Sequence, residues 1–229
     1  MHKLDIPQWL RDRVIPRRGR WEIFQEIDAP ATALLVVDMQ KAFVAEGAPL
    51  EVPVARSIVP NINAIAAALR AAGGHIIWVK TTLTDASGAS AWTVYHQNFF
   101  TPDKASYHRN AVSADAPWHD LYGELDVQAE DRVFEKKRFS AFFSNDPKLD
   151  DVLREKAIDT LIVTGTLTNL CCESTARDGM MSGYKILFPH DANATLTDEE
   201  HNGSLVNIAQ GFGDVRASAE IVAMLQAAR

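Results

Sequence analysis

Two adjacent cysteines, Cys171 and Cys172, stand where the sequence changes from an apolar run to a helical pattern. The run Thr160–Val163 is typical of a buried strand and Glu173–Met181 has helical character, so Cys171 is expected at or near the first turn of a helix. A helix N-terminus offers unpaired N–H groups and a positive partial charge, which favour the nucleophilic thiolate and could hold a developing oxyanion. The alternative is a pair of ordinary buried thiols.

A carboxylate and an ammonium stand in comparable places. The apolar run Ala33–Asp38 ends in a carboxylate, and Lys136 ends a weaker strand pattern. Because ligands of open parallel sheets bind beyond the carboxyl ends of the strands, Asp38, Lys136 and Cys171 can converge on one edge. Taken singly, Asp38 would be a helix-capping carboxylate and Lys136 a surface lysine beside Lys137. Together they favour nucleophilic catalysis by cysteine.

The elements that must position these residues alternate between strand and helix. A parallel sheet covered on both faces follows, because its strands are nearly continuous apolar runs. The fold class is therefore α/β, a three-layer α/β/α arrangement with a mostly parallel central sheet in a single domain, 1–229. The expected strands are Ala33–Asp38, Ile76–Val79, Arg132–Lys136, Thr160–Thr164, Tyr184–Phe188 and a short one near Val215, and the expected helices are Ile58–Ala72, Leu149–Lys156, Cys171–Met181, Glu199–Gln210 and Ala219–Ala228.

Two segments depart from this alternation. An N-terminal arm, about residues 1–30, carries five arginines among prolines and acidic residues and is expected to be solvated or to contact another subunit. A stretch of about residues 81–131 is rich in Ser, Asp, His and aromatic residues. A connection this long is usually functional, so we interpret it as a lid or substrate-binding excursion. The alternative is that its aromatic side chains only pack it onto the domain.

Composition limits the classes of function. The 229 residues are 47% hydrophobic, the net charge is −7 and the sequence pI is about 5.5, which argues against a general nucleic-acid surface. Neighbouring cysteines in a helix cannot easily form a disulfide, so a reducing compartment is expected. The sequence shows neither the apolar region of a signal peptide nor a run of about 18 apolar residues, which predicts a cytoplasmic protein without a membrane partner.

Three motifs contain these residues. Asp-x-Gln-x-x-Phe begins at Asp38, Lys-x-Arg-aromatic-Ser-x-Phe begins at Lys136, and Gly-x-x-Thr-Asn-x-Cys ends at Cys171. In this order they resemble the signatures of the isochorismatase-like cysteine hydrolases, and they are closest in motif to the ureidoacrylate amidohydrolase branch. The resemblance implies the three-layer fold, a homo-oligomer (dimer or tetramer) and a catalytic triad of Asp38, Lys136 and Cys171. It prefers Lys136 to Lys137, which the physics of the sequence alone cannot separate.

The resemblance also implies roles. Asp38 takes the thiol proton and later gives it to the departing nitrogen, while Lys136 orients Asp38 and favours the thiolate. A cis peptide bond is implied between Thr166 and Leu167. It would turn the Leu167 N–H toward the same point as the Cys171 N–H, and these two donors would form the oxyanion hole.

Substrate contacts are expected from the excursion and the motifs. Asn98 and Phe99 match an Asn-Phe pair of the resembling branch, Phe139 would wall the pocket, and Gln40 belongs to the first motif. The alternative is that these residues only pack. Cationic side chains near the motifs further suggest that the substrate carries a carboxylate; they are Lys80, Lys104, Arg109 and Arg138.

The expected function is a metal-independent cysteine amidohydrolase that cleaves a small linear amide, ureide or carbamoyl compound through a thioester. We expect no cofactor, because the histidines are too scattered for a metal site; they include His96, His108, His119, His190 and His201. One alternative is an isochorismatase-type vinyl-ether hydrolase, against which the thiol of Cys171 counts. The other is a non-catalytic or redox-active thiol protein that binds ligands.

Overall fold

Parallel strands form the centre of the chain, for which a computed structural model describes residues 1–84, 91–144 and 147–227. In these residues the strands pair in the order β3-β2-β1-β4-β5-β7, and the short β6 pairs with β4; every pairing between named strands is parallel. The strands are β1 (Thr32–Val37), β2 (His75–Thr81), β3 (Arg132–Lys136), β4 (Thr160–Thr166), β5 (Lys185–Pro189), β6 (Asn193–Ala194) and β7 (Asp214–Arg216).

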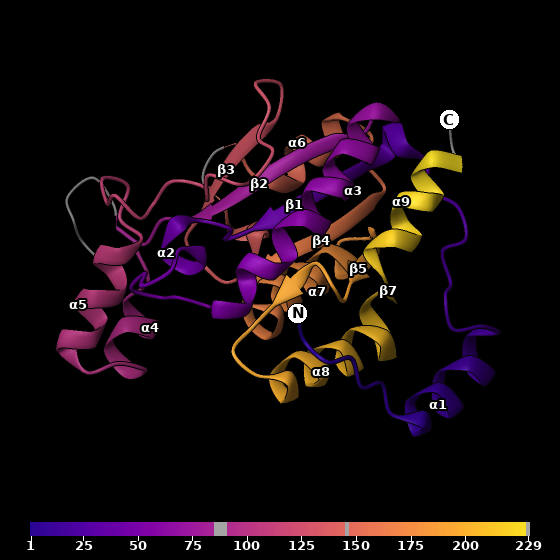
Figure 1. Ribbon diagram of the computed structural model, residues 1–229, viewed down its shortest axis with the longest axis horizontal. Helices are drawn as coiled ribbons and strands as arrows, with labels where there is room; N and C mark the ends of the chain where they lie inside the picture. Colours follow the sequence, from indigo (N-terminus) through magenta and orange to yellow (C-terminus); the bar gives the residue numbers. More distant parts are fainter. Residues whose placement is uncertain (85–90, 145–146, 228–229) are drawn as a thin grey trace.

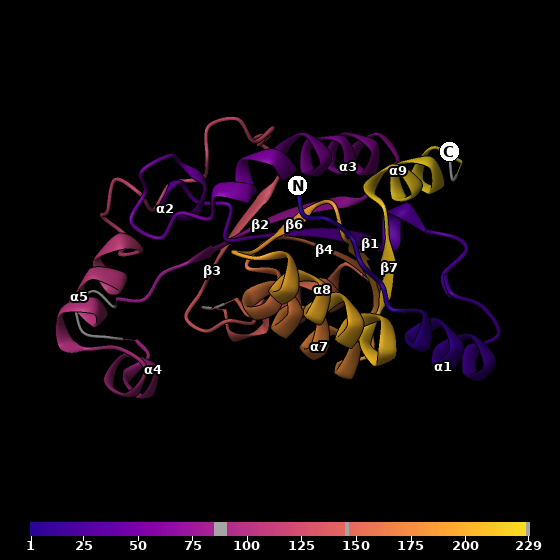
Figure 2. The ribbon, with the colours of Figure 1, turned by 60° about the horizontal axis from the view of Figure 1, so that its bottom comes forward.

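Helices cover both faces of this sheet. In Figure 2, α3 and α9 lie on one face and α7 and α8 on the other. Successive side chains of β1 point to opposite faces, so Leu34 joins the core under α3 and α9, whereas Leu35 joins the core under α6, α7 and α8. The predicted three-layer α/β fold is confirmed. The helices are α1 (Gln8–Arg18), α2 (Lys41–Val44), α3 (Val59–Ala71), α4 (Thr93–Asn98), α5 (Pro102–Ala111), α6 (Leu149–Glu155), α7 (Glu173–Met181), α8 (Asp198–Asn207) and α9 (Ser218–Ala227).

Among the described helices, none has the length and apolar content that a membrane crossing needs.

The expected elements are present with shifted ends. The helix expected from Cys171 is preceded by a π turn that begins at Thr168, and the one expected over Glu199–Gln210 is α8 followed by a second π turn, Ile208–Phe212. Ala228, the expected last residue of the final helix, lies outside the described residues. Helix ends depend on the contacts at each end, which periodicity alone does not specify.

The N-terminal arm contains a helix that sequence analysis missed. Leu10 and Val14 of α1 are fully buried in the core beneath α6, α7 and α8. Arg18 donates to the Ala209 backbone carbonyl at 2.9 Å, and Arg17 donates to that of Gln210. Most residues of the arm are nevertheless exposed, so these few contacts attach a largely solvated, mostly polar segment to the domain. A contact with another subunit stays a prediction.

The excursion contains two helices, α4 and α5, and its residues 85–90 lie outside the described part of the chain. Figures 1 and 2 both show α4 and α5 beyond the end of the sheet near α2, apart from the helices that cover its faces. Rings of this segment contact one another: Tyr95 stacks on Trp92 with centroids 4.5 Å apart and meets Phe100 edge-on at 5.0 Å. The excursion thus has ring contacts of its own at the carboxyl edge of the sheet, and it is joined to the domain through contacts such as that of Tyr95 with Phe139.

Candidate active site

Asp38 directly follows β1 and has an unusual backbone. Its φ is +52°, in the left-handed region that non-glycine residues seldom adopt and that is found disproportionately at functional sites. Its backbone N–H donates to the Val79 carbonyl at 2.8 Å, which fixes the turn against β2. Its side-chain Oδ1 accepts a hydrogen bond from the Thr81 hydroxyl at 2.8 Å. The carboxylate therefore points across the carboxyl edge of the sheet.

Lys136, the last residue of β3, is fully buried beside this carboxylate. Its Nζ lies 2.8 Å from Asp38 Oδ2 and 3.5 Å from Cys171 Sγ, and it donates to Thr81 Oγ1 at 2.5 Å and to the Arg138 carbonyl at 3.0 Å. Burial works against its charge, but Asp38 and Cys171 outweigh burial and raise the pKa of Lys136. Lys136 is therefore an ammonium that links the carboxylate to the thiol.

Thr81 is a member of this cluster that sequence analysis missed. It ends β2 directly opposite Lys136 in the β2–β3 register. Its hydroxyl accepts from the ammonium and donates to Asp38, so it orients both groups. The available signal was its place at the end of the strand between the Asp38 and Lys136 strands.

Cys171 lies in the π turn Thr168–Cys172, which we call the cysteine segment. Turns of this kind are rare in proteins, and those that do occur are often found at functional sites. Burial, followed by the negative charge of Asp38, raises the pKa of the Cys171 thiol, although Lys136 opposes the shift. Lys136 thus favours the thiolate, whereas burial and the charge of Asp38 favour the protonated thiol. A thiol with a raised pKa needs a base to take its proton, and the Asp38 carboxylate, which shares the Lys136 ammonium with it, is the candidate base.

Cys172 and Lys137 occupy different surroundings from their neighbours. Cys172 is fully buried in the core beneath α6, α7 and α8, whereas Lys137 is half-buried and its backbone N–H donates to the Phe143 carbonyl at 3.2 Å. The structure thus brings together Asp38, Lys136 and Cys171, the three residues that the motifs selected.

The loop between β4 and the cysteine segment approaches β1 closely. Gly165 has a φ of +116°, and a Cβ there would lie 2.0 Å from the Val37 carbonyl oxygen, so only glycine fits. The peptide bond between Thr166 and Leu167 is cis, and Leu167 lines the same pocket as Cys171. An oxyanion hole formed by the N–H groups of Leu167 and Cys171 stays a prediction.

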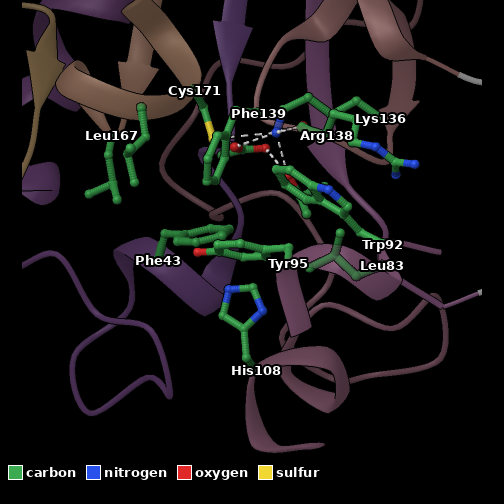
Figure 3. Close-up of a pocket in the computed structure, with 13 residues that line it drawn as sticks. Phe43, Leu83, Trp92, Tyr95, His108, Lys136, Arg138, Phe139, Leu167 and Cys171 are labelled. Carbon is green, nitrogen blue, oxygen red and sulfur yellow. Dashed lines mark hydrogen bonds and ion pairs between the residues drawn. The ribbon is translucent and has the colours of Figure 1, made fainter. Parts of the chain in front are cut away.

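A pocket opens beside the Cys171 sulfur. Its volume of about 60 Å³ exceeds several-fold the roughly 10–15 Å³ that one water molecule requires, so it can hold a small molecule. Figure 3 shows Cys171 and Phe139 on one side and Phe43 and Tyr95 on the other, with the dashed lines converging on the Lys136 nitrogen. Phe139 thus lies where the sequence predicted. The remaining wall is mostly apolar; beyond the charged cluster and Phe139, it comprises Phe43, Leu83, Trp92, Tyr95, His108, Arg138, Leu167 and Leu170.

Three other expected substrate contacts lie elsewhere. Asn98 is exposed and donates to the Val94 carbonyl of its own helix at 2.8 Å, and Phe99 is 73% exposed. Gln40 is buried behind the site, where its side chain bonds the backbone of Thr81 and of His119. None of the three is among the described residues that line the pocket. Gln40 instead holds the backbone of Thr81 in place from behind the site. A substrate contact by Asn98 or Phe99 stays a prediction.

The cations expected to bind a carboxylate are mostly remote from the pocket. Lys80 lies 3.3 Å from His119 and 3.8 Å from Glu135, while Lys104 and Arg109 stand on α5. Of the four, only Arg138 belongs to the described pocket lining. Its guanidinium donates to the carbonyls of Ala91 at 2.9 Å and Lys137 at 2.7 Å, and it lies 5.2 Å from the Trp92 ring.

The histidines are largely buried. His96, His119 and His201 are at most 4% exposed, and His96 lies 3.2 Å from His108, which lines the pocket. Burial, aided by His96 and Arg109, lowers the pKa of His108 to about 4, so it is neutral at pH 7. Within the described residues, no three His, Cys, Asp or Glu side chains gather as a metal site would require.

Fold and site together define an α/β protein with a cysteine-hydrolase type of centre: a thiol, a base that can take its proton, and a third group that orients the base. The chain belongs to the isochorismatase family, because the model of the isochorismatase domain matches residues 32–220. It is thus an isochorismatase-family hydrolase.

Individual relatives agree with this assignment. The isochorismatase family protein YwoC of Bacillus subtilis is 33% identical over 198 residues, 86% of this chain and 95% of that protein. The ureidoacrylate amidohydrolase RutB of Klebsiella pneumoniae is 37% identical over 194 residues, 80% of this chain and 81% of that protein. The crystal structure of a cysteine hydrolase from Pseudomonas syringae superposes with a TM-score of 0.78 at 29% identity, covering 92% of this chain and 100% of that one.

Proposed function

We propose that the protein is a metal-independent cysteine amidohydrolase that cleaves a small linear amide, ureide or carbamoyl compound through a thioester. The observation that carries this proposal is the position of the Lys136 ammonium, 2.8 Å from the Asp38 carboxylate and 3.5 Å from the Cys171 sulfur. A nucleophile, a base and an orienting group at these distances suit acyl transfer. The amidohydrolase RutB, 37% identical, supports the amide as the bond that is cleaved.

The reaction follows from the protonation states. Asp38 takes the thiol proton as Cys171 sulfur attacks the carbonyl carbon, and the carbonyl electrons move onto oxygen as an oxyanion. The C–N bond then breaks, and the nitrogen leaves with the proton that Asp38 returns. Water attacks the resulting thioester while Asp38 takes its proton, and the sulfur departs to recover that proton. Lys136 remains charged throughout and keeps Asp38 aligned.

The pocket supports a neutral substrate. Apolar and aromatic side chains form most of its wall, His108 is neutral at pH 7, and Nη1 of Arg138 already donates to two carbonyls. A carboxylate would lose its hydration against this largely apolar wall, where Lys136 is already paired with Asp38 and Arg138 Nη1 is already engaged, and that loss costs free energy. We therefore favour a neutral amide that presents a flat or apolar group, and the carboxylate expected from the sequence stays the alternative that the substrate panel tests.

A panel of amides and ureides, each paired with a carboxylate-bearing counterpart and scored by ammonia release, tests the proposal. We expect release from at least one small amide, an intact-mass increase equal to the acyl group when turnover is quenched, and undiminished activity after exhaustive treatment with EDTA. If none of the substrates that are hydrolysed leaves an acyl-enzyme in the quenched sample, the thioester mechanism is contradicted. Activity lost to EDTA and restored by zinc or iron would contradict metal independence. Preference for the carboxylate-bearing counterparts would contradict the neutral substrate alone.

We also expect a homo-oligomer, a dimer or tetramer, in the cytoplasm. Apolar side chains exposed on and beside α4 and α5 support assembly: Val94 is 67%, Phe99 73% and Tyr107 54% exposed. Light scattering during size-exclusion chromatography would measure the mass, and a monomer at micromolar concentration would contradict this expectation.

A further inference from the structure

His2 is buried against parts of the chain that lie almost two hundred residues away. Its side chain is 3% exposed, with Nδ1 2.8 Å from Asp198 Oδ1. Its Nε2 accepts a hydrogen bond from the Thr195 backbone N–H at 3.0 Å. Its ring stacks on that of His201 with centroids 4.4 Å apart. His2 thus joins helix α8 to the connection that precedes it.

Two short chains of contacts lead from His2 to the cysteine segment. The Thr195 hydroxyl donates to Asn169 Oδ1 at 2.7 Å, and His201 Nδ1 lies 2.9 Å from the Thr168 hydroxyl. The Ser204 hydroxyl also donates to the Thr168 carbonyl, at 3.2 Å. Thr168, Thr195 and His201 are at most 1% exposed, and hydrogen bonds between buried groups are stronger than those in water. The residues that precede Cys171 in its motif are therefore held from the side of His2.

The contacts of His2 specify one tautomer. A backbone N–H can only donate, so Nε2 facing Thr195 carries no proton, and the proton resides on Nδ1, which donates to the Asp198 carboxylate. The ring therefore joins these two partners by accepting at one nitrogen and donating at the other. A side chain that cannot both accept from Thr195 and donate to Asp198 would break the connection.

We propose that His2 is a positioning residue that, through Thr195 and His201, holds the cysteine segment where the Cys171 sulfur meets Lys136. The proposal rests on the nucleophilic role proposed for Cys171. Among the described residues its side chain contacts Asp198, Thr195 and His201, none of which lines the pocket, so its effect should fall on turnover and leave substrate binding unchanged.

The test compares His2→Ala, His2→Gln and Lys3→Ala by steady-state kinetics, thermal unfolding and hydrogen exchange. Lys3 is the matched control, because its backbone bonds Asp198 and Asn202 while its side chain is exposed. His2→Ala should lower kcat about tenfold, the effect of roughly one lost hydrogen bond, with KM unchanged. Exchange in the peptide that contains the cysteine segment should become faster. His2→Gln, whose amide can both accept and donate, should recover most of kcat.

The outcomes separate the two proposals. Unchanged kcat and unchanged exchange of the cysteine segment in His2→Ala would overturn the positioning role, whatever happens to thermal stability. An equal fall of kcat in Lys3→Ala would overturn it as well. If His2→Ala does not fold, His2→Gln against Lys3→Ala decides by the same two measurements. If exchange of the cysteine segment is faster in His2→Ala but neither the unsubstituted protein nor any variant hydrolyses an amide, the positioning role stands and only the proposed function is contradicted.

Discussion

The two halves of the pocket are built by different means. The half on the sheet consists of Asp38, Thr81 and Lys136 at the ends of three adjacent parallel strands, each at most 7% exposed and bonded to the next. The half on the excursion consists of rings such as Tyr95 and Trp92, which contact one another face to face or edge to face. Charged groups that hydrogen bond one another at strand ends can be neither moved nor replaced without breaking those bonds. Contacts between rings depend less on exact geometry, so they tolerate substitution. The comparison assigns the chemistry to the sheet and substrate selection to the excursion.

Replacement of Cys171 should give the largest effect. Cys171→Ser and Cys171→Ala should reduce turnover more than about a thousandfold, because the covalent route disappears. Cys172→Ala, in the core directly behind, should retain most turnover and lose only stability. Ammonia release and intact mass after quenching measure both. An essential Cys172 with a dispensable Cys171 would refute the assignment of the thiol.

Loss of the ammonium should be next in size. Lys136→Met removes the charge from a fully buried pair and leaves Asp38 uncompensated, which costs about 3–5 kcal/mol of unfolding free energy. Turnover should fall by at least about a hundredfold because Asp38 is no longer aligned as base. Lys137→Met is the control, and denaturant titration with kinetics checks both. Equal losses in the two variants would remove the special role of Lys136.

Changes on the excursion should be smaller and should affect substrate choice. Tyr95→Leu removes a ring that lines the pocket and meets Phe139 edge-on at 5.3 Å, so kcat/KM should fall about tenfold, the scale of one aromatic contact. Phe99→Leu changes an exposed ring one turn further along and should alter kcat/KM little. If Phe99→Leu has the larger effect, Phe99 rather than Tyr95 takes part in selecting the substrate, as the sequence suggested.

A separate effect concerns stability at acid pH and not turnover. Burial lowers the pKa of His108 to about 4 in the folded chain, whereas an unfolded histidine titrates near 6.5. Between these values the unfolded state binds more protons, so stability is complete above pH 7 and falls as the pH decreases. His108 should account for about 2 kcal/mol of the loss between pH 7 and pH 5. Urea unfolding at both pH values should show a smaller loss in His108→Gln, and an unchanged loss would contradict the shift.

The sequence by itself determined the sheet and the position of its reactive residues. A strand buried on both faces must be a nearly continuous apolar run, so β1 and β4 were visible, and a carboxylate or thiol just beyond such a run can only stand at the sheet edge. Resemblance of the motifs then selected Asp38, Lys136 and Cys171.

Only the tertiary structure decided which partners these residues meet. Lys136 differs from Lys137, and Cys171 from Cys172, because adjacent side chains point into different surroundings, which the sequence does not record. Thr81 became part of the site through the register of β2 against β3. The aromatic wall and the burial of His2 depend on contacts between segments far apart in the chain, and no local pattern predicts those.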